Sequence, residues 1–267
     1  MYEKIDPVEI PEIHTTDAIL PPELQMLDLP RGYGVKGGAA RAIVTYTLFG
    51  QELPVRDIDL ISLPYADESL AGELAMKYMP RDFKYGHGPE LSASVEDLIV
   101  GRDFTMNEVV VVDGKIFYTD KAKEALKDKH IELSSEIPGI KMKAKAQLFA
   151  AALEAAGFTP SVAEELNQIY WDPFWCGLML DRALEQGDKV ADLYTKRLTR
   201  AMSEARTSTV ELARWVADDP YLSNVSFEHV TALLMKENPD YLIGDRYSGH
   251  YSQLGQNALK GWRHAQD

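Results

Sequence analysis

The sequence predicts an α/β head with a mixed sheet, followed by an all-α helical domain, on three observations. An apolar run over residues 38–49 ends at a glycine and is followed by a β-rich run over 55–62, the order of a helix, a stop and a strand. Four valines at 109–112 are joined by Asp113-Gly114 to a second β-rich run, which predicts a hairpin. From residue 141 onward, apolar residues recur almost only at helical spacing.

These observations predict three regions. Residues 1–32 carry five prolines and are expected to form an extended arm packed on the head, which spans 33–138. Residues 139–267 are expected to form the helical domain. The head should hold further helices near 67–79 and 94–100. In the helical domain, helices are expected at 141–156, 161–170, 173–186, 189–205, 208–218 and 226–237.

Two aspartates, Asp57 and Asp59, stand one residue apart in the predicted strand. Successive strand side chains point to opposite faces, so these two should share a face about 7 Å apart, with Ile58 and Leu60 directed into the core. Two carboxylates at that separation can bind a pair of Mg²⁺ ions of the kind used in phosphoryl transfer. Because Asp-x-Asp also occurs by chance as a solvated strand end, its meaning depends on the neighbouring motifs.

The glycine pair Gly37-Gly38 opens the predicted helix upstream of the aspartates. Backbone N–H groups at a helix start bind anionic oxygens, and glycine lets them approach a phosphate closely. A glycine pair before a helix is commonly only a packing turn. Its place before an aspartate pair favours a site for a nucleoside triphosphate and its metals.

A second block, Arg102-Asp103-Phe104-Thr105-Met106-Asn107, follows downstream. Together with Gly37, Gly38, Arg41, Gly50 and the aspartate pair, it resembles the head of class II tRNA nucleotidyltransferases (CCA-adding enzymes) and bacterial poly(A) polymerases. Both belong to the polymerase-beta-like nucleotidyltransferase superfamily. The resemblance covers residues 33 to 135.

The resemblance implies transfer of a nucleoside monophosphate from ATP or CTP to an acceptor hydroxyl, with release of pyrophosphate. It implies an RNA 3′ end as acceptor. By the same resemblance, Asp57 and Asp59 are the catalytic residues that hold two Mg²⁺ ions. The residues implied to bind the nucleotide are Gly37, Gly38 and Arg41 at the phosphates, Arg102 and Asp103 near the ribose, and Asn107 in support of that turn.

Several positions depart from the family pattern. Ala42 and Gly101 stand where the family has an aspartate and an arginine. A third carboxylate has no clear equivalent, and Glu90 and then Glu96 are the candidates. The motif that reads the base is not visible where it should fall. Three lysines stand near that region instead: Lys141, Lys143 and Lys145. These departures bear on the choice of base and acceptor more than on metal binding.

The formal net charge is −14, and the acidic excess lies mostly before residue 121, with 21 acidic and 10 basic residues. Tight RNA binders usually present a basic surface, so the charge disfavours an RNA acceptor. Two alternatives therefore stay open: transfer to a protein or small molecule, and a non-catalytic interaction module. The candidate RNA-contacting positions, which fit a solvated helix face equally well, are Lys141, Lys143, Lys145, Lys196, Arg197, Arg200 and Arg206.

The remaining composition sets outer bounds. No apolar run approaches the ~20 residues that span a bilayer, so no membrane association is expected. The single cysteine, Cys176, cannot form an internal disulfide, which predicts a cytoplasmic protein. Aromatic residues of the helical part are expected in its core rather than stacked on RNA bases: Tyr170, Trp171, Phe174, Trp175, Tyr194 and Trp215.

Overall fold

The computed structural model describes residues 11–80, 83, 86–100, 102–134, 140–167, 179 and 182–205. The chain divides into two compact units, Met1–Glu136 and Ile137–Asp267. The first unit contains the sheet and the residues of the candidate site. Among the residues described, no helix has both the length and the apolar character needed to cross a bilayer.

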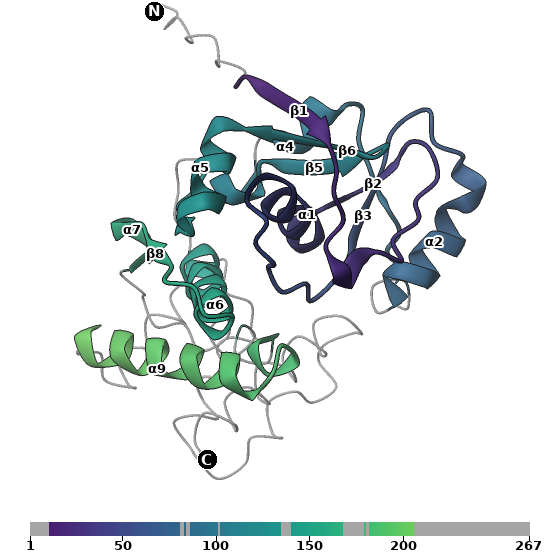
Figure 1. Cartoon of the computed structure of the whole chain (residues 1–267). Coiled ribbons are helices and arrows are strands. Elements are labelled where there is room, and N and C mark those ends of the chain that lie inside the picture. Colours follow the sequence, from purple (N-terminus) through teal and green to yellow (C-terminus); the bar gives the residue numbers. More distant parts are fainter. Residues whose placement is uncertain are drawn as a thin grey trace, which may run out of the picture. The chain divides into compact units, whose positions relative to one another are not determined.

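A six-stranded mixed sheet forms the framework of the first unit, in the order β1-β6-β5-β2-β3-β4 (Figure 1). All neighbouring pairs are antiparallel except β3 and β4, which are parallel. The mixed α/β head predicted from the sequence is thus confirmed. The strands of this sheet are β1 (Ile13–Asp17), β2 (Tyr33–Lys36), β3 (Asp59–Ser62), β4 (Glu90–Leu91), β5 (Val109–Val112) and β6 (Lys115–Thr119).

The predicted hairpin joins β5 to β6. Its turn residues, Asp113 and Gly114, have φ of 51° and 72°. Two successive positive φ values match a type I′ turn, whose twist suits antiparallel strands. Strand β1 pairs with β6 on the side of β6 that faces away from β5. Ile13 lies opposite Thr119, and Asp17 lies opposite Lys115. The region predicted as an arm therefore contributes a strand to the sheet.

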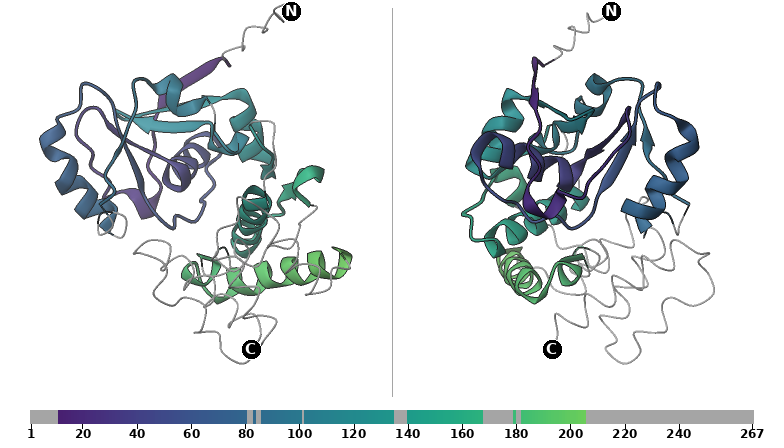
Figure 2. Two further views of the ribbon diagram at one scale, coloured as in Figure 1. Left: turned by 180° about the vertical axis from the view of Figure 1, so that it is seen from behind. Right: turned by 45° about the vertical axis from the view of Figure 1, so that its right-hand side comes forward.

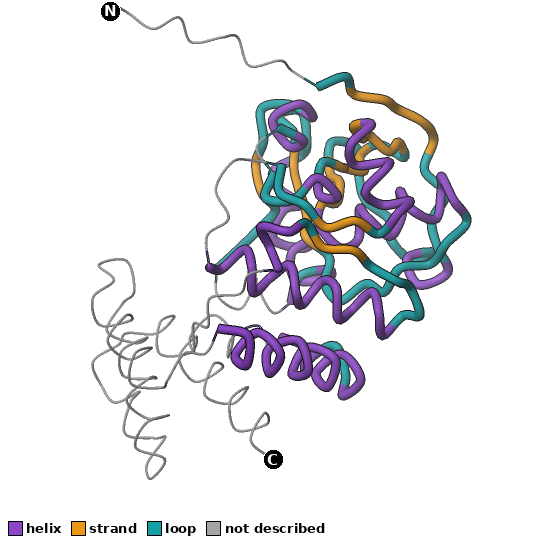
Figure 3. Tube along the Cα trace, turned by 90° about the vertical axis from the view of Figure 1, so that its left-hand side faces the viewer, coloured by secondary structure: helices purple, strands orange, loops and turns teal. Residues whose placement is uncertain are grey.

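Helices interleave with these strands along the chain, as the coloured tube in Figure 3 shows. The predicted helices near 38–49, 67–79 and 94–100 are confirmed within a few residues. Side chains cap two of the described α-helix starts of the head: Ser94 accepts a hydrogen bond from the Asp97 N–H at 3.1 Å, and Thr119 from the Ala122 N–H at 3.0 Å. The helical elements of the head are η1 (Pro22–Leu24), α1 (Gly37–Phe49), η2 (Glu68–Leu70), α2 (Ala71–Tyr78), α4 (Val95–Ile99), η3 (Thr105–Asn107) and α5 (Asp120–Asp128).

The core of the head lies on both faces of the sheet. Val110 and Val112 pack with Leu98 and Ile99 of α4, while α1 contacts β5 and β2. All four valines of β5 are therefore buried, as expected of a strand covered on both sides. Helices α2 and α5 lie at opposite ends of the head (Figures 1 and 2). A short strand, β7 (His130–Ile131), follows α5.

In the described part of the second unit, the regular elements are helices and the two-residue strand β8 (Ser161–Val162). Its helices are α6 (Ile140–Ala155), α7 (Glu164–Asn167) and α9 (Asp188–Ala205), and α6 packs against α9. The predictions for 141–156 and 189–205 are confirmed, whereas 161–170 begins with β8 and turns helical only at Glu164. Tyr194 is fully buried, as predicted for a core aromatic.

Other predictions for this unit fall on a part of the chain beyond the described residues. Within the expected helix 173–186, residues 179 and 182–185 are described and helical. The expected helices 208–218 and 226–237 lie outside the described residues, as do Arg206 and the other aromatic residues of the group: Tyr170, Trp171, Phe174, Trp175 and Trp215.

Candidate functional site

Strand β3 begins at Asp59, so the strand predicted over 55–62 is wrong for residues 55–58. The reason lies in its neighbour. Asp59 pairs with Lys36, the last residue of β2, and the chain turns into α1 directly afterwards, which leaves the residues before Asp59 without a ladder partner. Asp57 therefore precedes the strand. Leu60 is buried as predicted, whereas Ile58 is only half-buried.

Both aspartates lie beside the start of α1. A Cβ on Gly37 would overlap Oδ2 of Asp59, and a Cβ on Gly38 would lie 3.7 Å from both the carbonyl oxygen and Oδ1 of Asp57. Both carboxylates thus lie against the glycine pair. Strand alternation does not account for this arrangement, because Asp57 precedes β3. The missing side chains of the glycines leave the room that the carboxylates occupy.

The environment of Asp59 makes its negative charge costly. Burial raises the pKa of this carboxyl group, and the nearby Asp57 raises it further, against the opposing effects of Lys36, Arg56 and Arg41. Two carboxylates that repel one another in a half-buried position favour a bound cation. Among the described residues, no group of three or more His, Cys, Asp or Glu side chains is placed to hold a metal. Magnesium is nevertheless commonly held by one or two carboxylates plus substrate phosphates and water, so this donor pair fits it.

A polar chain of three side chains connects α1 to the second sequence block. Arg41 donates from Nη1 to Oδ1 of Asn107. Asn107 in turn donates from Nδ2 to Oδ1 of Asp103 at 2.5 Å, and this oxygen also accepts the Phe104 N–H at 3.0 Å. Burial lowers the pKa of Arg41, and Asp103, Asp57 and Asp59 raise it. The two blocks that the sequence singled out are thus physically joined.

Four cations gather around the aspartate pair. They are Lys36, Arg41, Arg56 and Arg102. Arg56 donates from Nε to Oδ2 of Asp57 at 2.8 Å. Arg102 donates to the carbonyl of Leu98, and burial lowers its pKa while Asp103 and Asp59 raise it. The head is strongly acidic overall, so this gathering of basic side chains favours binding of an anion.

Sequence reasoning missed Lys36 and Arg56. A signal was present, because each directly precedes a motif residue: Lys36 stands before Gly37, and Arg56 before Asp57. What could not be read from the sequence is that both side chains turn toward carboxylates.

Of the two candidates for a third carboxylate, Glu90 lies near the site and Glu96 does not join it. Glu90 starts β4, the parallel neighbour of β3, and forms an ion pair with Lys36. Its other oxygen lies 3.8 Å from Nη2 of Arg102. Glu96 is exposed on α4.

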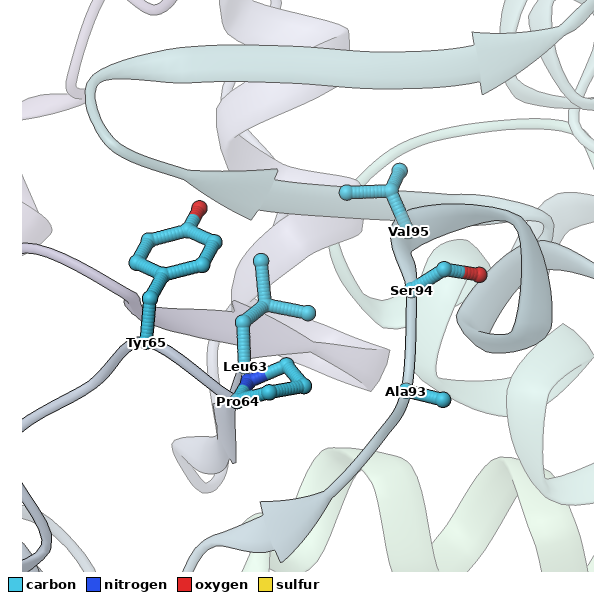
Figure 4. Close-up of a pocket in the computed structure, with 6 residues that line it drawn as sticks. All are labelled: Leu63, Pro64, Tyr65, Ala93, Ser94 and Val95. Carbon is cyan, nitrogen blue, oxygen red and sulfur yellow. The ribbon is translucent and has the colours of Figure 1, made fainter.

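A separate pocket of about 460 Å³ lies beyond the other end of β3 (Figure 4). The candidate site is at Asp59, the first residue of β3. This pocket adjoins the residues that follow Ser62, the last residue of β3. None of the residues predicted to bind nucleotide or metal lines it. Its lining is Leu63, Pro64, Tyr65, Ala93, Ser94 and Val95.

Replacing Asn107 with alanine should destabilise the head by about 1–3 kcal/mol, because it leaves polar groups of Arg41 and Asp103 without their shared partner in a part-buried site. Urea denaturation measures this change. The matched control is Ser69→Ala, which removes an exposed hydrogen bond to Asp67 and should change stability by less than about 0.5 kcal/mol. A loss for Asn107→Ala as small as the one expected for Ser69→Ala would show that the Arg41–Asn107–Asp103 chain contributes little stability.

Comparison with protein-family models and with curated proteins finds no match. Among solved structures, the chain is similar to a tRNA-processing enzyme with CTP at 16% identity and a TM-score of 0.40, covering 87% of this chain and 86% of that one. It is also similar to a tRNA nucleotidyltransferase complexed with a primer tRNA and an incoming ATP analog, at 18% identity and a TM-score of 0.41, covering 88% and 80%. A tRNA-processing enzyme in an apo form is similar at 20% identity and a TM-score of 0.42, covering 87% and 72%.

Proposed function

We propose that the head, expected from the sequence over residues 33–138 and joined in the structure by strand β1, is a metal-dependent nucleotidyltransferase. The observation that carries this proposal is the meeting of two carboxylates with a glycine-opened helix start. Four basic side chains surround them in an otherwise acidic head. This combination suits a substrate that brings both negative charge and bound cations, as a nucleoside triphosphate does.

Asp57 and Asp59 would hold the metal, two Mg²⁺ ions by the sequence resemblance. When bound, such ions lower the pKa of an attacking hydroxyl and stabilise the charge on the leaving pyrophosphate. The surrounding protein holds the two carboxylates in place. Arg56 fixes Oδ2 of Asp57, and the Lys36–Asp59 pairing at the end of the β2–β3 ladder positions Asp59.

The triphosphate would bind at the start of α1, where the N–H groups after Gly37 and Gly38 would face phosphate oxygens and Arg41, which donates to Asn107, would lie near them. In the reaction, the acceptor hydroxyl oxygen forms a bond to the α-phosphorus. The bond between that phosphorus and the bridging oxygen to the β-phosphate breaks, pyrophosphate leaves, and the hydroxyl proton is released to water. Arg102 and Asp103 would contact the ribose side of the nucleotide, with Asn107 fixing their turn.

The acceptor we propose is an RNA 3′ end, on the strength of the sequence motifs. Among the basic positions expected to contact RNA, we favour those whose side chains are exposed. Lys143 is buried, with its pKa lowered by burial against the effect of Glu165. Arg197 donates to Gln147 at 3.1 Å and to Glu154 at 2.9 Å. Lys141 and Lys196 are exposed and are the better candidates.

Replacing both Lys141 and Lys196 with glutamate should weaken tRNA binding and lower the slope of log affinity against log salt by roughly 0.7–0.9 for each phosphate that the protein no longer neutralises. Filter binding across a salt series measures the slope. Binding of free nucleotide should not change, because neither residue belongs to the motif blocks. If the wild-type protein shows no salt-sensitive tRNA binding even at low ionic strength, RNA is not the acceptor.

A protein or small-molecule acceptor is the second candidate, and the acidic excess of the head favours it because that charge repels a polyanion. Incubation with labelled ATP and CTP, Mg²⁺, total RNA and cell extract separates the candidates. Label in RNA supports the first, and label in protein or a small product supports the second. An absence of label in every fraction would favour a non-catalytic interaction module.

A further inference from the structure

Lys36 occupies a distinctive position in the head. It is the last residue of β2 and the residue directly before Gly37, at the N-cap of α1. Across the β2–β3 ladder it lies opposite Asp59, and its charge opposes the rise in the Asp59 pKa. Its ammonium group pairs with Glu90 of β4, the strand on the other side of β3, and its charge acts on Asp59.

Glu90 holds the Lys36 ammonium group through Oε2, and its Oε1 lies 3.8 Å from Nη2 of Arg102. One carboxylate thus neutralises two of the four cations around the aspartates. The exposures of the three side chains differ: Lys36 is 20% exposed and Arg102 19%, whereas Glu90 is 47% exposed. Glu90 is therefore the member of this group that can turn into water at the lowest cost, because it is already the most hydrated.

We propose that Lys36 binds the triphosphate tail of the nucleotide, and that Glu90 occupies Lys36 until the triphosphate displaces it. This inference rests on the proposed function and adds to it a phosphate-binding residue with an internal competitor. Phosphate oxygens are strong acceptors of charge-assisted hydrogen bonds, and lysine is a common phosphate ligand. The exchange replaces one anionic partner of Lys36 by another, so the ammonium group is paired in both states.

The first test compares a triphosphate with a monophosphate. Isothermal titration with ATP, inorganic tripolyphosphate and AMP, all with Mg²⁺, should show that Lys36→Met weakens ATP and tripolyphosphate binding roughly ten- to a hundredfold. AMP binding should be nearly unchanged, and Lys36→Arg should retain most of the triphosphate affinity. The matched control is Lys115→Met, which removes an exposed lysine of β6 and should alter none of these affinities.

The second test addresses Glu90. Glu90→Gln should strengthen tripolyphosphate binding, since the competing carboxylate is gone. The gain should be smaller in a Lys36→Met background, where only Arg102 remains to be released. This variant also keeps the proposal testable if Lys36→Met fails to fold, because the gain in affinity needs no change at Lys36.

The titrations distinguish a failure of the inference about Lys36 from a failure of the proposed function. Unchanged tripolyphosphate affinity in folded Lys36→Met, or weaker binding in Glu90→Gln, overturns the inference about Lys36 while the proposed function stands. A loss of AMP affinity equal to that of ATP would make Lys36 a general support of the site rather than a triphosphate ligand. A wild-type protein that binds neither ATP, CTP nor tripolyphosphate would overturn the proposed function itself.

Discussion

Asp57→Asn and Asp59→Asn should each reduce nucleotidyl transfer by roughly a thousandfold or more, because metal-ion stabilisation of the transition state is worth several kcal/mol. The substitutions keep the size and shape of the side chain but remove the negative charge that a divalent cation needs. Transfer of labelled nucleotide under saturating ATP and Mg²⁺ measures the loss. The matched control is Asp17→Asn, an exposed aspartate at the end of β1, which should leave transfer unchanged.

Asp59→Asn should lower transfer but should not lower the stability of the folded protein. Burial and Asp57 raise the pKa of Asp59, so the folded protein holds this proton more tightly than the unfolded chain does. Protonated Asp59 stabilises the folded state fully at pH values below the pKa of this carboxyl group in the unfolded chain. That stabilisation is lost as the pH rises through the higher pKa of Asp59 in the folded protein. At neutral pH without metal, Asp59→Asn should therefore melt at the same temperature as the wild type or higher.

Adding Mg²⁺ should reverse that order, because binding to the folded state stabilises only the protein that has both carboxylates. Thermal melts with and without Mg²⁺ measure this. A variant that keeps near-native transfer, or a wild-type melting temperature indifferent to Mg²⁺, would remove Asp57 and Asp59 from the metal site.

The sequence predicted what depends on local signals. The α1 helix has its glycine stop and the β5–β6 hairpin has its Asp-Gly turn, so each element was found near its true bounds. The start of β3 was missed because it depends on where β2 ends, a property of the pairing of two strands rather than of either segment.

The same distinction separates the site residues. Motif order brought Asp57, Asp59 and the glycine pair to attention, but no local signal shows that Glu90, remote in sequence, pairs with Lys36. Lys143, one of the candidate RNA-contacting lysines, is buried. The spacing of residues in the sequence could not show this, because burial depends on what packs over that side of α6. Patterns in a single sequence therefore do not predict which distant segments of this protein contact each other.

Gly37→Ala should reduce transfer by roughly a hundredfold, the loss expected when a catalytic group is displaced by about an ångström. A methyl group at Gly37 would overlap Oδ2 of Asp59, and that carboxylate is the part of the contact that can move. Gly37 also has a φ of +61°, so alanine there should cost about 1–2 kcal/mol in backbone strain.

Gly50→Ala is the control that separates strain from displacement. Gly50 ends the same helix at a φ of +65°, so alanine should cost a similar 1–2 kcal/mol there. Apart from Gly50 itself and the adjoining backbone, no atom of the described residues lies within 4 Å of the position its Cβ would take. The two variants should therefore melt at similar temperatures, while Gly37→Ala alone loses transfer.

Gly38 completes the comparison, because its Cβ would make ordinary contacts of 3.7 Å with Asp57. Gly38→Ala should fold normally, yet its methyl group lies at the helix start where the phosphates must approach, and nucleotide affinity should fall. Gly38→Val should lower the affinity further, as isothermal titration with ATP and Mg²⁺ would show. If Gly37→Ala keeps full transfer and Gly38→Val keeps full ATP affinity, the glycine pair is only a packing turn, and the triphosphate must bind elsewhere.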